Sequence, residues 1–291
     1  MQSLILVIAI FMAILALFPI AMHIGFRAPR NRETKTPADF DLPFSEYLIP
    51  SVSGKKLFAW LLKAENSKET LIVLHGWGSN SEWMLPVAKP FYHAGINVLL
   101  IDSRNHGNSD ADSFSSLPRF AEDMDKAIDW LKLNHTTLTD NIAILGHSVG
   151  AGAALFSASK RDDIQAIISI SAFAHPEWMM QRFLRKAYLP AFIIPVILRY
   201  VEWIIGHSFT SIAPLKTVCD INKPILLVHG KEDTTVPIED AHAIIKNCPK
   251  SQLQILEVEG AGHNSVDKVE QHSEELIAFL YRSGFAKASL P

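Results

Sequence analysis

Ser148 stands in the pentapeptide GHSVG at residues 146–150, between an apolar run of strand length and a run of small residues. Glycine on either side of the serine permits a strained turn from a strand into a helix, and such a turn lifts the hydroxyl clear of the backbone. The first turn of that helix also offers backbone N–H groups to developing negative charge. Ser148 is therefore a candidate nucleophile.

Two further residues could activate this serine. His263 lies in the glycine-rich sequence EGAGHN after another apolar run, and an imidazole suits general-base work near neutrality. Asp233 lies in HGKEDTTVP, where a carboxylate could orient the imidazole and stabilise its charged form, with the neighbouring Glu232 as the alternative. The chain order Ser148, Asp233, His263 is the order expected of a catalytic triad on a parallel α/β sheet.

A loop that binds an oxyanion is predicted from HGWG at residues 75–78, which also follows an apolar run. Glycine there lets the chain turn so that a backbone N–H points at the site. We expect the amides of Trp77 and Val149 to form the oxyanion hole, in which one donor contributes roughly 3 kcal/mol of barrier lowering. His75 is expected to tie this loop in place through its hydrogen bonds and to take no part in catalysis.

The elements that must position these residues follow from apolar periodicity. Strand-length runs alternate with helical patterns such as residues 120–131, whose apolar side chains fall on one face. This alternation predicts a parallel sheet covered on both sides, with ligands bound beyond the carboxyl ends of its strands. A hairpin is expected around residues 53–54. The predicted strands are Glu46–Pro50, Leu57–Leu62, Thr70–Leu74, Asn97–Ile101, Asn141–Leu145, Ala166–Ile170, Ile225–Val228 and Gln252–Val258.

An apolar insertion interrupts this pattern at about residues 174–213. It contains YLPAFIIPVILRYVEWII, residues 188–205, which is long enough to suggest a second membrane span. Arg199 and Glu202 would each cost about 3 kcal/mol at the middle of a bilayer, and two prolines interrupt the run, so this interpretation is rejected. A helical lid over an apolar pocket is favoured. Extra core and a surface that dips into a membrane are the alternatives.

The amino-terminal residues differ in character from the rest of the chain. Leu4–Ile24 contains no Asp, Glu, Lys or Arg, and about 20 apolar residues suffice to cross a bilayer. Residues 1–26 are therefore predicted to be a single-pass transmembrane anchor, with a cleaved signal peptide as the alternative. Four basic residues at 27–35 place the following domain on the cytoplasmic side. Residues 27–44 are predicted to be a linker, and residues 45–291 the main domain.

The composition excludes other classes of protein. A net charge of −3 gives no basic excess for binding nucleic acid. Cys219 and Cys248 are the only cysteines of the 291 residues, so neither a disulfide framework nor a zinc site is expected.

These motifs together resemble the α/β-hydrolase family, over about residues 46–285. Within that family the chain is most similar to the serine aminopeptidase-like and monoacylglycerol-lipase-like group, which includes membrane-anchored acyl hydrolases. The resemblance implies an α/β-hydrolase fold with a mostly parallel eight-stranded sheet flanked by helices. Asn105 stands where the family frequently has glycine. The motifs that carry the resemblance are HGWG at 75–78, DSRNHGNS at 102–109, GHSVG at 146–150, HGKED at 229–233 and GH at 262–263.

The expected activity is that of a serine hydrolase that cleaves a carboxylic ester or thioester through an acyl-enzyme, with no cofactor and no metal. The apolar insertion and the predicted anchor favour a small, lipophilic acyl substrate at a membrane. An aminopeptidase-like peptidase would need a group to hold the substrate ammonium, for which Glu177 and Glu202 are available. An acyltransferase on the same triad and a non-catalytic, ligand-sensing protein are further alternatives.

Overall fold

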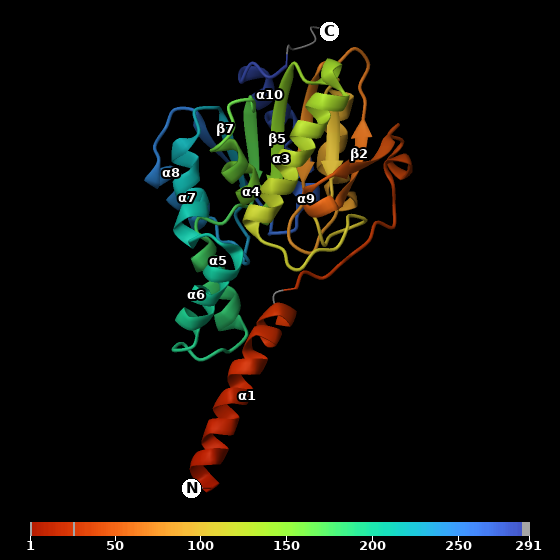
Figure 1. The fold of residues 1–291 in the computed structure, drawn as a ribbon. Helices are drawn as coiled ribbons and strands as arrows, with labels where there is room; N and C mark the ends of the chain where they lie inside the picture. Colours follow the sequence, from red (N-terminus) through yellow and green to blue (C-terminus); the bar gives the residue numbers. More distant parts are fainter. Residues whose placement is uncertain (1, 26, 287–291) are drawn as a thin grey trace.

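A computed structural model of the chain describes residues 2–25 and 27–286. Within this part of the chain, eight strands form one sheet in the order β1-β2-β4-β3-β5-β6-β7-β8 (Figure 1). β1 and β2 are antiparallel to their neighbours, and the strands from β4 to β8 along the sheet pair in parallel. The strands are β1 (Ser45–Pro50), β2 (Lys56–Leu62), β3 (Glu69–Leu74), β4 (Asn97–Ile101), β5 (Asn141–His147), β6 (Ala166–Ile170), β7 (Ile225–Gly230) and β8 (Leu253–Val258). The predicted mostly parallel, eight-stranded sheet is confirmed.

Helices cover both faces of this sheet, as the continuous apolar strand runs require. The described helices are α1 (Gln2–Gly25), α2 (Leu85–His93), α3 (Leu117–Asn134), α4 (Val149–Ala158), α5 (Pro176–Lys186), α6 (Ile194–Ile205), α7 (Pro214–Asp220), α8 (Glu239–Asn247), α9 (Val266–Glu270) and α10 (Ser273–Arg282). Helices α3, α4, α7 and α8 contribute to the core on one face of the sheet, and α2, α9 and α10 to the core on the other.

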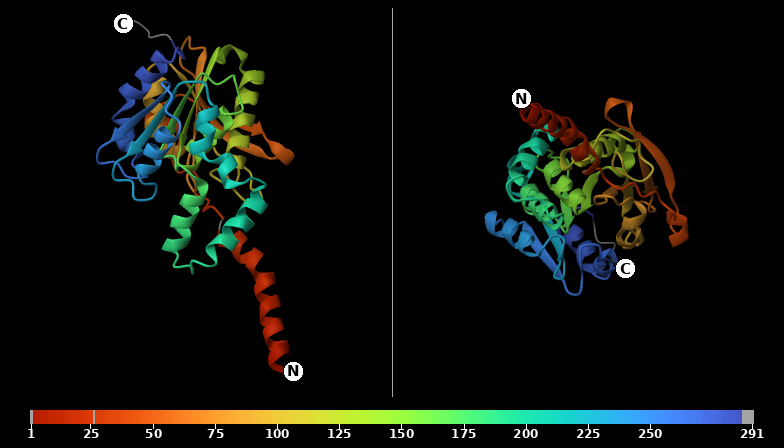
Figure 2. Two further views of the ribbon diagram at one scale, coloured as in Figure 1. Left: turned by 90° about the vertical axis from the view of Figure 1, so that its left-hand side faces the viewer. Right: turned by 90° about the horizontal axis from the view of Figure 1, so that it is seen from below.

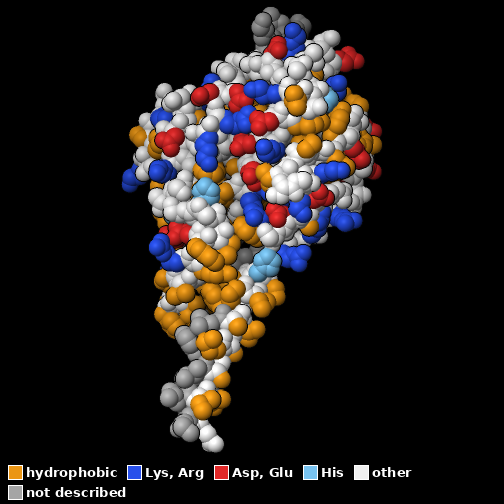
Figure 3. Space-filling view, viewed as in Figure 1, with side chains coloured by type: hydrophobic (Ala, Val, Ile, Leu, Met, Phe, Trp, Pro, Cys, Tyr) orange, Lys and Arg blue, Asp and Glu red, His pale blue; other side chains and the backbone are white. Residues whose placement is uncertain are grey.

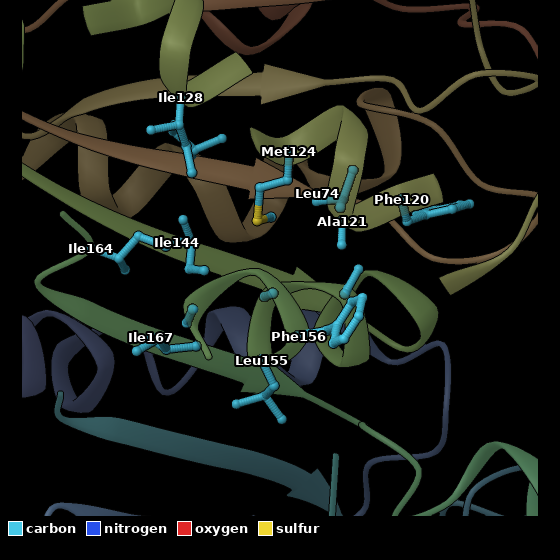
Figure 4. Packing of buried hydrophobic residues seen from close by; sticks show 14 of the residues in the cluster. Leu74, Phe120, Ala121, Met124, Ile128, Ile144, Leu155, Phe156, Ile164 and Ile167 are labelled. Carbon is cyan, nitrogen blue, oxygen red and sulfur yellow. The ribbon is translucent and has the colours of Figure 1, made fainter. Parts of the chain in front are cut away.

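Along the central strands, alternate residues enter opposite cores. Ile72 and Leu74 of β3 pack on the α3 and α4 side, whereas Leu71 and Val73 pack on the α2 side. Figure 4 shows the first of these cores, where the apolar stripe of α3 meets side chains of α4 and the sheet. The helical face predicted at residues 120–131 is buried here. In this core α4 packs directly behind the turn that follows β5.

The insertion forms a separate small core at one end of the sheet. Helices α5 and α6 project there, on the same side as α1 (Figures 1 and 2). Leu184 of α5 and Ile194, Ile197 and Leu198 of α6 are buried together with Phe209. The exposed side chains of this region are largely apolar, as the lower half of Figure 3 shows.

The amino-terminal helix α1 joins this small core. Met22 is buried against the insertion, and the ring centroid of Phe18 lies 5.1 Å from that of Tyr200. Among the residues that the structure describes, no helix is both long and apolar enough to cross a membrane. The predicted transmembrane anchor at residues 1–26 is therefore not supported, and the last turns of α1 pack against the protein's own insertion. The single-pass location and the cytoplasmic orientation of the domain depended on that anchor and are not supported either.

Residues 27–44, predicted to be a linker, lie against the domain over much of their length. Ala28, Pro37 and Leu42 are buried, and Leu42 belongs to the core on the α2 side of the sheet. The short helix Pro37–Phe40 begins with a capping box, in which Asp39 accepts a hydrogen bond from the backbone amide of Thr36. The segment therefore has a fixed path past the site.

Candidate active site

Ser148 occupies the turn between β5 and α4, with a backbone φ of 55° and ψ of −115°. A positive φ is strained for a serine, and it is held because the surrounding backbone leaves no room to relax. A Cβ at Gly146 would lie 2.2 Å from the carbonyl oxygen of Gly150, and a Cβ at Gly150 would lie 2.3 Å from that of His75. The motif therefore needs both glycines, and the strand-to-helix turn predicted from GHSVG is present.

The predicted triad residues meet beyond the carboxyl ends of three strands. His263 Nε2 lies 2.9 Å from Ser148 Oγ, and His263 Nδ1 lies 2.7 Å from Asp233 Oδ2. These distances allow the imidazole to accept the hydroxyl proton at one nitrogen while it donates to the carboxylate from the other. Glu232, the alternative to Asp233, is exposed.

Asp233 is well fixed for such a role. Its Oδ1 accepts hydrogen bonds from the amides of Thr235 and Val236, at 2.9 and 2.8 Å. Burial would raise the pKa of Asp233, but the hydrogen bond from His263 and those two amides outweigh it and hold the pKa below its ordinary value. The carboxylate therefore stays ionised near neutrality and can stabilise a positive charge on the imidazole.

His147 supports the loop of His263, a role that no sequence motif indicates. Burial lowers the pKa of His147 to about 4, so its ring is neutral near pH 7. Its Nε2 lies 2.8 Å from the carbonyl oxygen of His263 and donates to it. The only sequence signal for this contact is its position next to Ser148, which brings its side chain to the same strand end.

The turn of residues 76–79 lies beside the serine. A Cβ at Gly76 would lie 3.2 Å from Ser148 Cβ, and the amide of Ser79 donates to the carbonyl of Gly76 across the turn at 3.2 Å. Trp77 in this turn and Val149, the first residue of α4, both line the cavity next to Ser148. Since the first amides of a helix have no partner within it, the Val149 N–H is available to a substrate oxygen.

His75 ties this turn to the neighbouring loop, as the sequence predicts. Its Nδ1 lies 2.7 Å from the carbonyl oxygen of Gly76, and its Nε2 accepts the amide of Ser103 at 3.1 Å. Both ring nitrogens are therefore used by the backbone. Burial lowers the pKa of His75, which keeps the ring neutral. Asn105, where the family often has glycine, has φ of 70°, a conformation that asparagine tolerates better than most residues.

A cavity of about 590 Å³ opens in front of Ser148 and His263, within the range usual for small-molecule sites. Its far walls come from α5, α6 and the end of α1. Among the described residues that line it, none is Asp, Glu, Lys or Arg. The apolar lining from these helices comprises Met22, Pro176, Met179, Met180, Phe183, Tyr200, Val201, Ile204 and Ile205. The site therefore suits a neutral, apolar group. In the described part of the chain, no cluster of three or more His, Cys, Asp or Glu could hold a metal ion.

Glu33, from the segment that precedes the domain, is half-buried, and both of its carboxyl oxygens are inaccessible to solvent. A Cβ at Gly107 would lie 2.4 Å from Glu33 Oε1 and 2.0 Å from Asp102 Oδ2, so the two carboxyl groups share one small space. Neither oxygen of Glu33 accepts a hydrogen bond from a described donor. Burial, followed by the contact with Asp102, raises the pKa of Glu33 to about 9. Glu33 therefore keeps its proton near neutrality.

A prediction about stability follows from this raised pKa. A carboxyl group that binds its proton more tightly in the folded state stabilises the fold at low pH and loses that contribution as the pH rises towards 9. Glu33→Gln, which keeps the shape without titrating, should match the wild type near pH 5 and be the more stable protein near pH 9. Thermal unfolding of both proteins across this range measures the difference. Glu65→Gln, at an exposed position, is the control. Parallel curves for wild type and Glu33→Gln would contradict the assignment.

Comparison with known proteins agrees with this fold. Residues 65–217 match the family model described as serine aminopeptidase, S33, a hydrolase family. The chain is 28% identical to the uncharacterized protein YqkD of Bacillus subtilis, over 76% of each chain. It is 26% identical to the uncharacterized membrane protein YNL320W of Saccharomyces cerevisiae, over 86% of this chain and 84% of that one. Among solved structures, the esterase Pf2001 of Pyrococcus furiosus superposes with a TM-score of 0.71 at 24% identity, over 88% of this chain and 99% of that one.

The family match covers just over half of the chain and contains the GHSVG turn and the HGWG loop. Similarity to the esterase, at its low identity, supports the fold alone. The chain belongs to the serine aminopeptidase, S33, family of α/β hydrolases.

Proposed function

We propose that the protein is a serine hydrolase that cleaves an ester or thioester of a lipophilic acyl group. The observation that carries this proposal is the pair of contacts from one imidazole, 2.9 Å to Ser148 Oγ and 2.7 Å to Asp233 Oδ2, at the base of an apolar cavity. A nucleophile, a base and an orienting acid in mutual contact are what acyl transfer requires.

In the first half of the proposed reaction, Ser148 Oγ attacks the acyl carbonyl carbon while His263 Nε2 takes the hydroxyl proton. The carbonyl oxygen becomes an oxyanion and accepts hydrogen bonds from the amides of Trp77 and Val149. The bond to the leaving alcohol or thiol then breaks, and His263 returns its proton to that leaving group. This leaves an acyl-serine ester and a neutral imidazole.

In the second half, His263 takes a proton from a water molecule as that water attacks the acyl carbon. A second oxyanion forms at the same amides and collapses, and His263 protonates Ser148 Oγ as the carboxylic acid departs. Throughout, the carboxylate of Asp233 keeps the proton of the neutral imidazole on Nδ1 and stabilises the charged form.

The walls of the cavity favour an acyl substrate over a peptide with a free amino terminus. An aminopeptidase must hold an ammonium group, and the candidate carboxylates have other positions and partners. Neither Glu177 nor Glu202 is among the residues that line the cavity. Glu202 instead accepts the amide of Phe209 at 2.8 Å and lies 3.2 Å from Arg199. An apolar chain, by contrast, would be surrounded by methionine, isoleucine and aromatic side chains.

We therefore expect kcat/KM to rise with acyl length in a series of p-nitrophenyl esters from two to sixteen carbons, until the cavity is full. Burying one methylene group contributes about 0.8 kcal/mol, which corresponds to a rise of up to about fourfold per carbon. Val201 lines the cavity, so Val201→Phe should move the optimum to shorter chains. Val196→Phe is the matched control on the same helix, because Val196 is 59% exposed and lies outside the lining. A preference for acetyl esters in both variants and the wild type would contradict the proposed substrate class.

A further inference from the structure

We infer that Asn31, on the segment of residues 29–35 that precedes the hydrolase domain, acts in catalysis as a positioning residue by holding the turn that carries the Trp77 amide. The inference rests on the proposed function, because the turn matters in this way only if it binds an oxyanion. None of the sequence motifs includes this segment.

Asn31 contacts the turn directly. The side-chain Nδ2 of Asn31 donates to the backbone carbonyl oxygen of Gly78 at 2.8 Å. The backbone carbonyl oxygen of Asn31 accepts a hydrogen bond from Asn80 Nδ2 at 3.2 Å. Two hydrogen bonds, one donated in each direction, therefore join the segment to the turn and to the residue that follows it. Asn31 also lines the cavity that holds Ser148.

Pro29 closes the turn from outside. Gly78 has φ of +70°, and a Cβ at that position would lie 2.7 Å from Pro29 Cγ. Gly78 is thus needed for two reasons, the left-handed conformation of the turn and the close approach of the proline ring. The segment packs onto Gly78, one of the two glycines of the turn.

Further contacts attach the segment to the loop at residues 107–109 and to Glu82. Arg30 Nε donates to the carbonyl oxygen of Gly107 at 3.1 Å, and its guanidinium also donates to the carbonyl of Ser109. The amides of Thr34 and Lys35 donate to Glu82 Oε2, at 2.6 and 3.1 Å. The segment that carries Asn31 is therefore hydrogen-bonded to the domain on either side of its contact with the turn.

The turn lines the cavity and is partly exposed, and His75 holds its Gly76 end, so the contact with Asn31 supports its other end. Trp77 is 40% exposed, and within the turn a backbone hydrogen bond from the Ser79 amide to the Gly76 carbonyl closes the backbone. A donor in an oxyanion hole must stay within about half an ångström of its working position. Loss of one such donor costs about a hundredfold to a thousandfold in kcat. Loosening the turn leaves the donor in place, so kcat should fall by less, on the order of tenfold.

The test uses the full-length protein and two variants. Asn31→Ala removes the donor to Gly78, and Asn31→Asp replaces it by an acceptor that faces the same carbonyl oxygen. Arg32→Ala, at an exposed neighbouring position, is the control. Each protein is assayed for kcat and KM on an ester substrate. Each is also assayed for inhibition by a trifluoromethyl ketone, which forms an oxyanion on the serine, and by the matching alcohol, which does not.

For Asn31→Ala we expect kcat to fall about tenfold while KM changes by less than twofold, with a larger fall for Asn31→Asp. The inhibition constant of the ketone should rise by a similar factor, whereas that of the alcohol and the melting temperature should stay near the wild-type values. Arg32→Ala should behave as the wild type.

Two results would overturn the inference while leaving the proposed function intact. The first is an unchanged kcat and unchanged ketone inhibition in both Asn31 variants. The second is a parallel loss of ketone and alcohol binding with a lowered melting temperature, which would indicate a purely structural role. A wild-type protein that shows neither ester hydrolysis nor labelling of Ser148 by a fluorophosphonate would overturn the proposed function itself.

Discussion

Ser148→Ala should lower kcat for ester hydrolysis by about a millionfold, because loss of a triad serine removes the covalent route and leaves only the contribution of the oxyanion amides and substrate binding. Ser148 is 8% exposed, and its hydroxyl lies 2.9 Å from the imidazole nitrogen that would take its proton. Hydrolysis of a p-nitrophenyl ester and labelling by a fluorophosphonate measure the loss. The melting temperature should change little, because the hydroxyl makes no contribution to the core.

A second buried serine provides the control for this experiment. Ser169 on β6 is 1% exposed, and among the described residues its hydroxyl has no hydrogen-bond partner. Ser169→Ala should therefore retain wild-type turnover and labelling. If Ser148→Ala kept most of the activity, another nucleophile would be at work and the proposed mechanism would be wrong.

Asp233→Asn should lower kcat by about ten thousandfold with little effect on KM. The asparagine amide would donate to His263 Nδ1, which forces the imidazole proton onto Nε2 and leaves no acceptor for the hydroxyl of Ser148. The substitution also removes the negative charge that stabilises the charged imidazole. Since Asp233 Oδ1 accepts two backbone amides, circular dichroism and thermal unfolding must show that the variant is folded.

Glu232→Gln is the matched control, with the same chemical change one residue earlier in the chain. Glu232 is exposed, whereas Asp233 is buried at 2.7 Å from the imidazole. We expect Glu232→Gln to keep near wild-type kcat. A large loss in Glu232→Gln together with a small loss in Asp233→Asn would reverse the assignment of the acid.

Much of the fold could be predicted from the sequence because buried strands and helix faces show an apolar pattern within a few consecutive residues. Strands that are covered on both faces need continuous apolar runs, and the eight predicted strands agree with the observed ones to within two residues. The turn at 146–150 could also be predicted, since its two glycines meet a steric requirement within a few residues of chain. The positions of Ser148, Asp233 and His263 at one edge of the sheet followed from the parallel order of the strands.

Only the tertiary structure distinguished Asp233 from Glu232, because both carboxylates are compatible with the local pattern and the conformation of the loop decides which one faces His263. Only the structure showed the end of α1 against the insertion, since an apolar run is suited equally to lipid and to a protein core. The contacts of Asn31 and Glu33 could not be predicted either, because polar side chains in a proline-containing segment are also typical of a solvated linker. Their partners, Gly78 and Asp102, are distant in sequence, and whether such a side chain bonds to water or to the backbone of a remote loop depends on how the loops meet after folding.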